Sequence, residues 1–237
     1  DGDFNVGVTS TDALVEMVQD YASKGIYLTV CGFGSGNLND SMMEQISNKG
    51  NGTYEYIDSE DELSKVFVNE RSKFQAVAND SKVQVTFNKE KVDSYRLIGY
   101  ENRVMANEDF EDDTKDAGEI GAGQTITALY EIIPAEGYDC EGALAVFDFR
   151  YKKMLGEESI PLTLDIANTY TLDAVPTELR FAAGIAAYGM LLRDSKYKGS
   201  ATFDMAYQLV GERLLFDKYG YRAQLQELIL MAKNVQQ

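Results

Sequence analysis

The sequence contains no histidine and only two cysteines among its 237 residues. Histidine is the usual general base and the usual zinc ligand, so its absence removes Ser-His and Cys-His nucleophile systems. The cysteines, Cys31 and Cys140, fit no metal-binding spacing, and Cys31 falls in an apolar segment where a buried structural thiol is expected. Conventional hydrolase chemistry therefore loses most of its support.

Basic residues are scarce as well: 22 lysines and arginines stand against 39 aspartates and glutamates, for a net charge of −17 at pH 7. A phosphate backbone would be repelled by such a surface, and no basic stripe is visible, so nucleic acid is not expected as a partner. The charge favours cations, basic protein surfaces and solvation. Apolar residues at 44% and charged residues at 26% exclude a disordered acidic chain.

Long apolar runs are also absent. No run approaches the ~20 residues that cross a bilayer, so no transmembrane segment is predicted. The length of 237 residues suits one or two domains. No internal repeat or low-complexity linker is visible, and the domain boundaries rest on changes in the hydrophobic period.

Residues 1–74 alternate between helical and strand patterns, which is typical of a parallel doubly wound sheet. Gly25 can end the first helix as a left-handed cap, Asn39 can cap the second, and Ser59 with Glu62 forms a capping box for the third. The expected elements are a helix with an apolar stripe over 14–21, a strand over 26–33, a helix from 39 to Gly50, a strand over 53–57 and a helix from 59.

Residues 75–170 follow a period of two, which predicts an antiparallel β-sandwich. The expected strands include residues 83–87, 126–132, 145–151 and 162–166. Residues 171–237 return to the helical period, with one helix from Pro176 to about Asp194, rich in small residues for close packing, and two more over 203–216 and 223–232.

Several ordered motifs resemble the C-terminal part of a von Willebrand factor A domain, followed by the conserved region of the bacterial YfbK-type proteins. The resemblance covers nearly the whole chain. Its segments are DGDFN at 1–5, the strand at 26–33, GFGSGN at 32–37, MMEQ at 42–45, KGNGTY at 49–54, YRLIGYENR at 95–103 and DAGEIGAG at 116–123.

The resemblance implies a multidomain α+β protein: the C-terminal half of a doubly wound A-domain sheet, then the β-sandwich, then the helical segment. It also implies that Asp1 belongs to the Asp-Gly loop of a magnesium or manganese site. The Ser and Thr loops of that site would lie upstream, so the chain as given is expected to hold no metal there, because a single carboxylate is a weak magnesium site.

Two further candidate cation sites come from the residues themselves. Asp1, Asp3 and Asn5, with Asp12, imitate part of a calcium loop, although Val6 stands where the sharp turn needs glycine. The acidic loop from Glu108 to Asp116 is a candidate for binding calcium or a basic partner, but a solvated acidic surface is its default explanation. A calcium-binding structural module is therefore the alternative function.

The loop at 32–36 lacks the Lys-Ser/Thr of a phosphate-binding loop and is expected to connect a strand to a helix. Because it follows a parallel strand, it belongs to the ligand-binding edge of such a sheet. Asn37, Asn39 and Asp40 are the candidate contacts on this rim.

The resemblance implies a non-enzymatic adhesive or scaffolding protein of the bacterial cell envelope with a protein partner. Half of a doubly wound sheet leaves an unpaired edge and an apolar face. We therefore expect the α/β layer either to cover itself against the β-sandwich or to exchange elements with a second copy in a homo-oligomer. A carboxylate-based hydrolase is the third alternative, but nothing selects one acidic pair.

Overall fold

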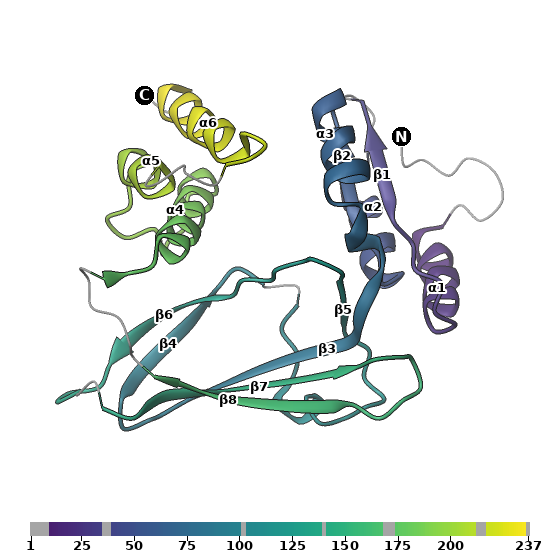
Figure 1. The fold of residues 1–237 in the computed structure, drawn as a ribbon, viewed down its shortest axis with the longest axis horizontal. Helices are drawn as coiled ribbons and strands as arrows, with labels where there is room; N and C mark the ends of the chain where they lie inside the picture. The colour runs from purple at the N-terminus through teal and green to yellow at the C-terminus, as the bar shows by residue number, and fades with distance from the viewer. Residues whose placement is uncertain are drawn as a thin grey trace. The chain divides into compact units, whose positions relative to one another are not determined.

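The computed structural model describes residues 10–34, 39–100, 103–138, 141–167, 174–211 and 217–235 (Figure 1). The fold mixes α-helices with one parallel and several antiparallel strand pairings, which confirms the predicted mixed class at that level. The helices are α1 (Thr11–Ala22), α2 (Asp40–Lys49), α3 (Glu60–Ser64), α4 (Thr177–Leu192), α5 (Phe203–Gly211) and α6 (Tyr221–Val235). The strands are β1 (Val30–Phe33), β2 (Tyr54–Ile57), β3 (Ala76–Phe87), β4 (Val92–Ile98), β5 (Gly118–Gly121), β6 (Leu129–Pro134), β7 (Ala143–Lys152) and β8 (Ile160–Ala167).

The chain forms two compact units, each built from separate stretches of sequence. The first unit holds residues 1–86, 105–125 and 146–164, and the second holds residues 87–104, 126–145 and 165–237. The predicted division at residues 74 and 170 follows the hydrophobic period along the chain and stays a prediction, as does the sandwich.

The helices of the first unit begin at the predicted caps. The Asn39 side chain accepts a hydrogen bond from the Met42 amide at 3.2 Å, and Ser59 accepts one from the Glu62 amide at 3.2 Å. Both bonds satisfy amide groups that the first turn of a helix leaves unpaired. Gly25 has the left-handed conformation expected of it, with φ +78°.

β1 and β2 run parallel, with Val30 opposite Tyr54 and Phe33 opposite Ile57. A core of Leu14, Met42 and Ile46 packs beside this pair. The predicted stripe of α2 is buried, but that of α1 is buried only in part, because Met17 and Tyr21 are 42% and 48% exposed.

The first strand is shorter than predicted, because β1 begins at Val30 and leaves residues 26–29 outside it. The Leu28 amide donates to the Gly50 carbonyl at 2.9 Å, in the turn that ends α2. A Cβ on Gly52 would lie 1.7 Å from the Leu28 carbonyl oxygen, so this stretch packs directly against the α2–β2 turn. Backbone contact with that turn takes the place of ladder pairing.

The main sheet of the first unit has the strand order β5-β3-β7-β8. β3 and β5 pair antiparallel with two register shifts, one of them between Ala78 and Ser81. The segment between β4 and β5 covers part of this sheet. The Lys82 ammonium of β3 donates to the Asp109 carbonyl of this segment at 3.2 Å, and Phe110 is buried.

In the second unit, β4 and β6 pair antiparallel from Val92 opposite Pro134 to Ile98 opposite Leu129. β6 begins later than predicted, and Ile126 lies outside it with 58% of its surface exposed. The rings of Phe87, Tyr95 and Tyr130 form an aromatic cluster at this pair. Phe87 and Tyr130 belong to the predicted alternating strands at 83–87 and 126–132, whereas Tyr95 comes from β4, which was not predicted.

Helices α4, α5 and α6 share a core of Ala187, Ala206, Val210 and Ile229. A Cβ on Gly184 would come within 2.9 Å of the Val210 side chain, which confirms the close packing predicted from the small residues of α4. Within the described part of the chain, no helix has the length and apolar character needed to cross a membrane.

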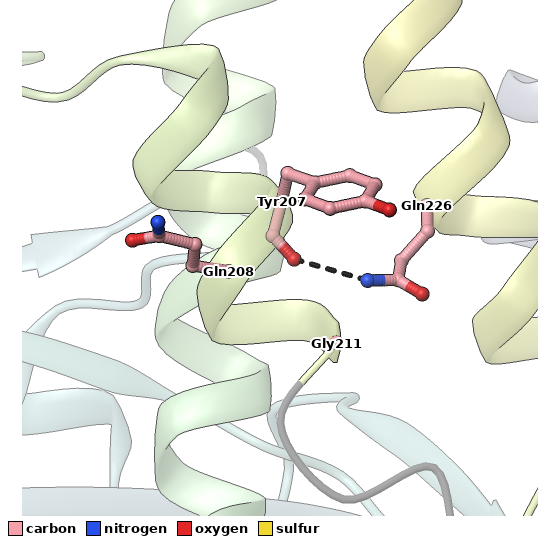
Figure 2. A pocket seen from close by; sticks show the side chains of 4 residues that line it. All are labelled: Tyr207, Gln208, Gly211 and Gln226. Carbon is pink, nitrogen blue, oxygen red and sulfur yellow. Dashed lines mark hydrogen bonds between the residues drawn. The ribbon is translucent and has the colours of Figure 1, made fainter.

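An open recess of about 340 Å³ lies between α5 and α6 (Figure 2). Gln226 reaches from α6 and donates to the Tyr207 carbonyl of α5 at 3.2 Å. Its lining of Tyr207, Gln208, Gly211 and Gln226 carries no charge, so we assign the recess to helix packing.

Candidate functional site

Three carboxylates from separate parts of the first unit meet beside the β3–β5 pair. Asp80 lies in β3, Glu119 lies in β5, and Asp116 lies just before β5. One carboxylate oxygen from each residue lies within 4.8 Å of the others. We call Asp80, Asp116 and Glu119 the carboxylate cluster.

Strand pairing and a bulge bring the cluster together. Ser81 lies opposite Gly118 and Ala78 opposite Ile120, with a register shift between the two pairs. Asp80 occupies that shift with φ +47°, a left-handed conformation that aspartate tolerates better than most residues. The bulge changes the direction of its side chain relative to a regular strand.

Asp80 is buried and paired with a lysine from β7. The Lys152 ammonium donates to Asp80 Oδ2 at 2.6 Å, and each side chain is 8% exposed. Lys152 also donates to the Asp113 carbonyl at 2.9 Å, and the Ala117 amide donates to Asp80 Oδ1 at 3.3 Å. The hydrogen bonds replace part of the hydration that both charges lose on burial.

The α/β layer of the same unit reaches the cluster through Asn51. This residue lies in the turn after α2 with φ +50°, and its amide donates to Asp116 Oδ1 at 3.2 Å and Glu119 Oε1 at 2.9 Å. Next to the cluster, the Tyr27 hydroxyl donates to Asn79 Oδ1 at 2.7 Å. The cluster therefore joins the α2–β2 turn to the main sheet.

Burial raises the pKa of Glu119 to about 8, and repulsion from Asp116 and Asp80 acts in the same direction. Asp116 as a residue is exposed, but desolvation of its carboxyl still raises its pKa, against the hydrogen bond from Asn51. Burial, with the nearby carboxylates, also raises the pKa of Tyr27 to about 12. The cluster holds more negative charge than Lys152 neutralises.

Such a site can take up positive charge in two ways. Glu119 can hold a proton near neutral pH, or a divalent cation can bind the carboxylate oxygens, which are the ligands that calcium and magnesium prefer. Asp116 opens to solvent on one side and Asp80 is enclosed on the other. A cation would therefore approach from the Asp116 side.

The acidic loop before β5 is more ordered than a solvated surface would be. Asp113 accepts hydrogen bonds from the Ser159 hydroxyl and amide and from Arg150, and these interactions lower its pKa to about 2. The Asp112 side chain accepts from the Thr114 amide at 2.9 Å. Asp113 therefore has a structural role, whereas Glu108 and Glu111 are exposed, as the solvated alternative predicts. Among the described carboxylates of the loop, only Asp116 joins the cluster.

Of the residues predicted for the metal site and the ligand rim, the structure describes Asn39 and Asp40, and neither belongs to the carboxylate cluster. Asp1, Asp3, Asn5 and Asn37 fall outside the described residues. Asn39 caps α2, and the neighbouring Asp40 accepts a hydrogen bond from the Tyr54 hydroxyl. The rim and metal assignments made for these residues therefore stay predictions.

Sequence reasoning missed Asp80, Glu119, Asn51 and Lys152 as a group. Asp116 and Glu119 lie in the motif at 116–123, and Asn51 lies in the motif at 49–54, but neither motif indicates a shared site. Asp80 lies in an ordinary strand pattern, and only the β3–β5 register brings it to the other two carboxylates. Neither of the two recesses described, between α5 and α6 and beside Asp148 and Arg150, is lined by Glu119.

Replacing Lys152 by methionine should destabilise the protein by about 3 kcal/mol, because it leaves the Asp80 carboxylate buried without its cation. Urea unfolding at pH 7 measures the change. The matched control is Lys153→Met at the adjacent exposed position, for which we expect less than about 0.5 kcal/mol. Equal effects of the two substitutions would contradict the role given to the Lys152–Asp80 pair.

Glu119→Gln should change how stability depends on pH. The folded protein binds the Glu119 proton more tightly than the unfolded chain, so this contribution is complete below pH 4.5 and is lost as pH rises through about 8. The neutral glutamine removes that decline. At pH 8.5 the variant should be more stable than the parent by at least about 1.4 kcal/mol, the equivalent of one pKa unit.

The test measures the free energy of unfolding from pH 5 to pH 8.5 for the parent, Glu119→Gln and Glu108→Gln. Glu108 is an exposed carboxylate outside the cluster, and its substitution should leave the profile unchanged. Parallel profiles for the parent and Glu119→Gln would show that Glu119 titrates as an ordinary carboxylate.

Comparison with known proteins places most of this chain in one family. A family model described as "Uncharacterized protein YfbK, C-terminal" matches residues 72–141 and 137–235, a region that includes the whole carboxylate cluster and Lys152. The chain is also 36% identical over 253 residues to the "Uncharacterized protein YfbK" of Escherichia coli (strain K12). That alignment covers 99% of this chain and 44% of the relative, so the chain spans less than half of the relative's length. The chain belongs to the YfbK family.

Proposed function

We propose that this chain acts in protein–protein interaction, as a non-enzymatic adhesive or scaffolding part of a bacterial cell-envelope protein. The observation that carries the proposal is the parallel β1–β2 pair with its flanking helices. Parallel strands place their carboxyl ends on one edge, and that edge is where open α/β sheets bind ligands. The envelope location rests on the family resemblance.

This edge presents groups suited to a protein partner. Phe33, the last residue of β1, is 59% exposed. The Tyr56 hydroxyl donates to the Gly34 carbonyl at 2.9 Å, and Asp40 begins α2 just beyond the loop. Exposed aromatic rings beside polar groups are typical of the centres of protein interfaces.

Metal dependence is part of the proposal. In an intact A domain, an acidic residue of the partner would complete the coordination of magnesium or manganese at this edge. The relative is more than twice as long as the region that it shares with this chain. The proposal places the hydroxyl ligands of the metal site upstream of Asp1, as the family resemblance implies.

Calorimetric titration with magnesium and manganese tests the metal site on two proteins: this chain, and the same chain extended upstream to the relative's length. We expect binding at the A-domain site only in the extended protein. Equal affinity in both would assign the cation to residues of the present chain and contradict a site completed from upstream.

Capture of envelope proteins by the immobilised extended chain tests the edge itself. Capture should require manganese, disappear with chelator and fall strongly with Phe33→Ser. Met154→Ser is the matched control, because Met154 is an apolar residue with similar exposure, 66%, outside this edge. Capture that is indifferent to both chelator and Phe33→Ser would argue against the proposal.

The second candidate function is a calcium-binding structural module, and the carboxylate cluster favours it. Its ligand atoms are carboxylate oxygens from β3, from β5 and from the segment just before β5. The Asn51 side chain of the α2–β2 turn donates hydrogen bonds to two of these carboxylates. A bound cation would replace the proton on Glu119 and join these segments more firmly.

Calcium should raise the melting temperature of the parent chain if the cluster binds it, because a ligand of the native state stabilises that state. Glu119→Gln removes one charged ligand. The variant should therefore need about ten times more calcium, or more, for the same rise in melting temperature. Glu108→Gln should respond as the parent does. A calcium response that Glu119→Gln leaves intact would move the cation away from the cluster.

A further inference from the structure

A tyrosine ring in the second unit lies against two positive charges. The Arg96 guanidinium of β4 lies over the Tyr197 ring, with its central carbon 4.2 Å from the ring centroid. The Lys196 ammonium lies 4.8 Å from the same centroid. Both distances fall within the ~6 Å over which an aromatic ring attracts a cation. We call Arg96, Lys196 and Tyr197 the cation–tyrosine patch.

The turn after α4 positions this ring. Asp194 has a left-handed backbone with φ +46°, just beyond the end of the helix. The Ser195 amide donates to the Met190 carbonyl at 2.9 Å, and the hydroxyl of this buried serine accepts from the Tyr197 amide at 3.2 Å. Tyr197 itself is 48% exposed. The turn therefore fixes the backbone of Tyr197 and leaves its side chain accessible to a partner.

Strand pairing orients Arg96 against the ring. Arg96 lies opposite Glu131 of β6, and its Nε and Nη2 atoms both donate to Glu131 Oε2, at 3.1 and 2.5 Å. Its Nη1 atom has no hydrogen-bond partner among the described residues. Since a guanidinium has five N–H donors, Arg96 can bind a further acceptor without leaving Glu131.

Lys196 differs from its neighbour Lys198 in having no ionic partner. The Lys198 ammonium pairs with Asp194 at 2.5 Å, whereas Lys196 pairs with no carboxylate in the part of the chain that the structure describes. Two cations beside one ring repel each other, and Glu131 neutralises only the charge of Arg96. An anionic group bound at the ring would offset the remaining positive charge.

The charge of the whole chain selects the kind of anion that fits. A membrane or a nucleic acid extends far beyond the patch, so it would also meet the acidic surface of a chain with net charge −17 and be repelled. Charges at physiological ionic strength act over about 8 Å, so a short acidic peptide interacts mainly with the groups that it contacts. Carboxylates also match the donor geometry of a guanidinium.

We propose that the cation–tyrosine patch binds a short, carboxylate-rich peptide segment of a partner protein. A carboxylate accepts from Nη1 of Arg96, a neighbouring carboxylate pairs with the Lys196 ammonium, and the Tyr197 ring contacts the peptide between them. This surface belongs to the second unit alone. It goes beyond the proposed function, because it depends neither on the β1–β2 edge nor on a metal.

Fluorescence anisotropy with a labelled hexaglutamate peptide, at about 0.15 M salt, tests the patch. The chain should bind hexaglutamate and leave labelled hexaglutamine unbound. Arg96→Gln combined with Lys196→Gln should raise the dissociation constant about tenfold or more, because it removes two charge-assisted contacts. Lys196→Gln alone changes an exposed side chain and should weaken binding in the same direction. Circular dichroism confirms that the variants are folded.

Lys218→Gln is the matched control, because the Lys218 ammonium also lies beside a tyrosine ring, 4.7 Å from the Tyr219 centroid, and the substitution removes the same charge. It should leave the affinity for hexaglutamate unchanged. A parent that does not bind hexaglutamate would overturn the proposal, and so would an equal loss of affinity in Lys218→Gln and in the double variant. Binding to vesicles of phosphatidylserine and phosphatidylcholine in place of hexaglutamate would assign the patch to an anionic membrane surface and overturn it as well.

Discussion

The Lys152–Asp80 pair joins two strands of the first unit through residues that lie 72 positions apart in the sequence. Two charges that are each 8% exposed lose most of their hydration, and an isolated ion in that position would cost several kcal/mol. The Asp113 carbonyl and the Ala117 amide compensate for this loss, and both come from the segment before β5. The pair therefore fixes β3, β7 and that segment in a single arrangement.

The candidate site follows from that arrangement. Once Asp80 is held in the bulge, Asp116 and Glu119 lie close enough to repel it and each other. Lys152 is already committed to Asp80, so the remaining negative charge must be balanced by a proton or a cation, or tolerated at a cost in stability. Asn51 connects the same hydrogen-bond network to the α2–β2 turn. A proton or cation bound at the cluster would therefore affect the layer that carries the proposed protein-binding edge.

Local sequence signals predicted much of the α/β layer. The caps at Asn39 and Ser59, the left-handed Gly25 and the apolar stripe of α2 are set by interactions within a few residues, and the structure confirms them. The cluster could not be predicted in this way, because it depends on the β3–β5 register and on a bulge that no alternation of residues encodes. The short β1 has a similar cause, since the Leu28 contact with the α2–β2 turn is a tertiary one. Period-two alternation predicted parts of β3, β7 and β8 in the main sheet, but it did not predict β5, whose four residues are too few to show the period.

The titration of the Glu119 side-chain carboxyl by carbon-13 NMR tests most directly whether the three carboxylates act together. Glu119→Gln assigns the resonance. A midpoint near pH 8 that falls when calcium is added is the expected result, because the buried carboxylates raise the proton affinity of Glu119 and a cation would compete with the proton. A midpoint near the ordinary glutamate value of 4.5, unchanged by calcium, would show that the three carboxylates do not act together and would contradict the account.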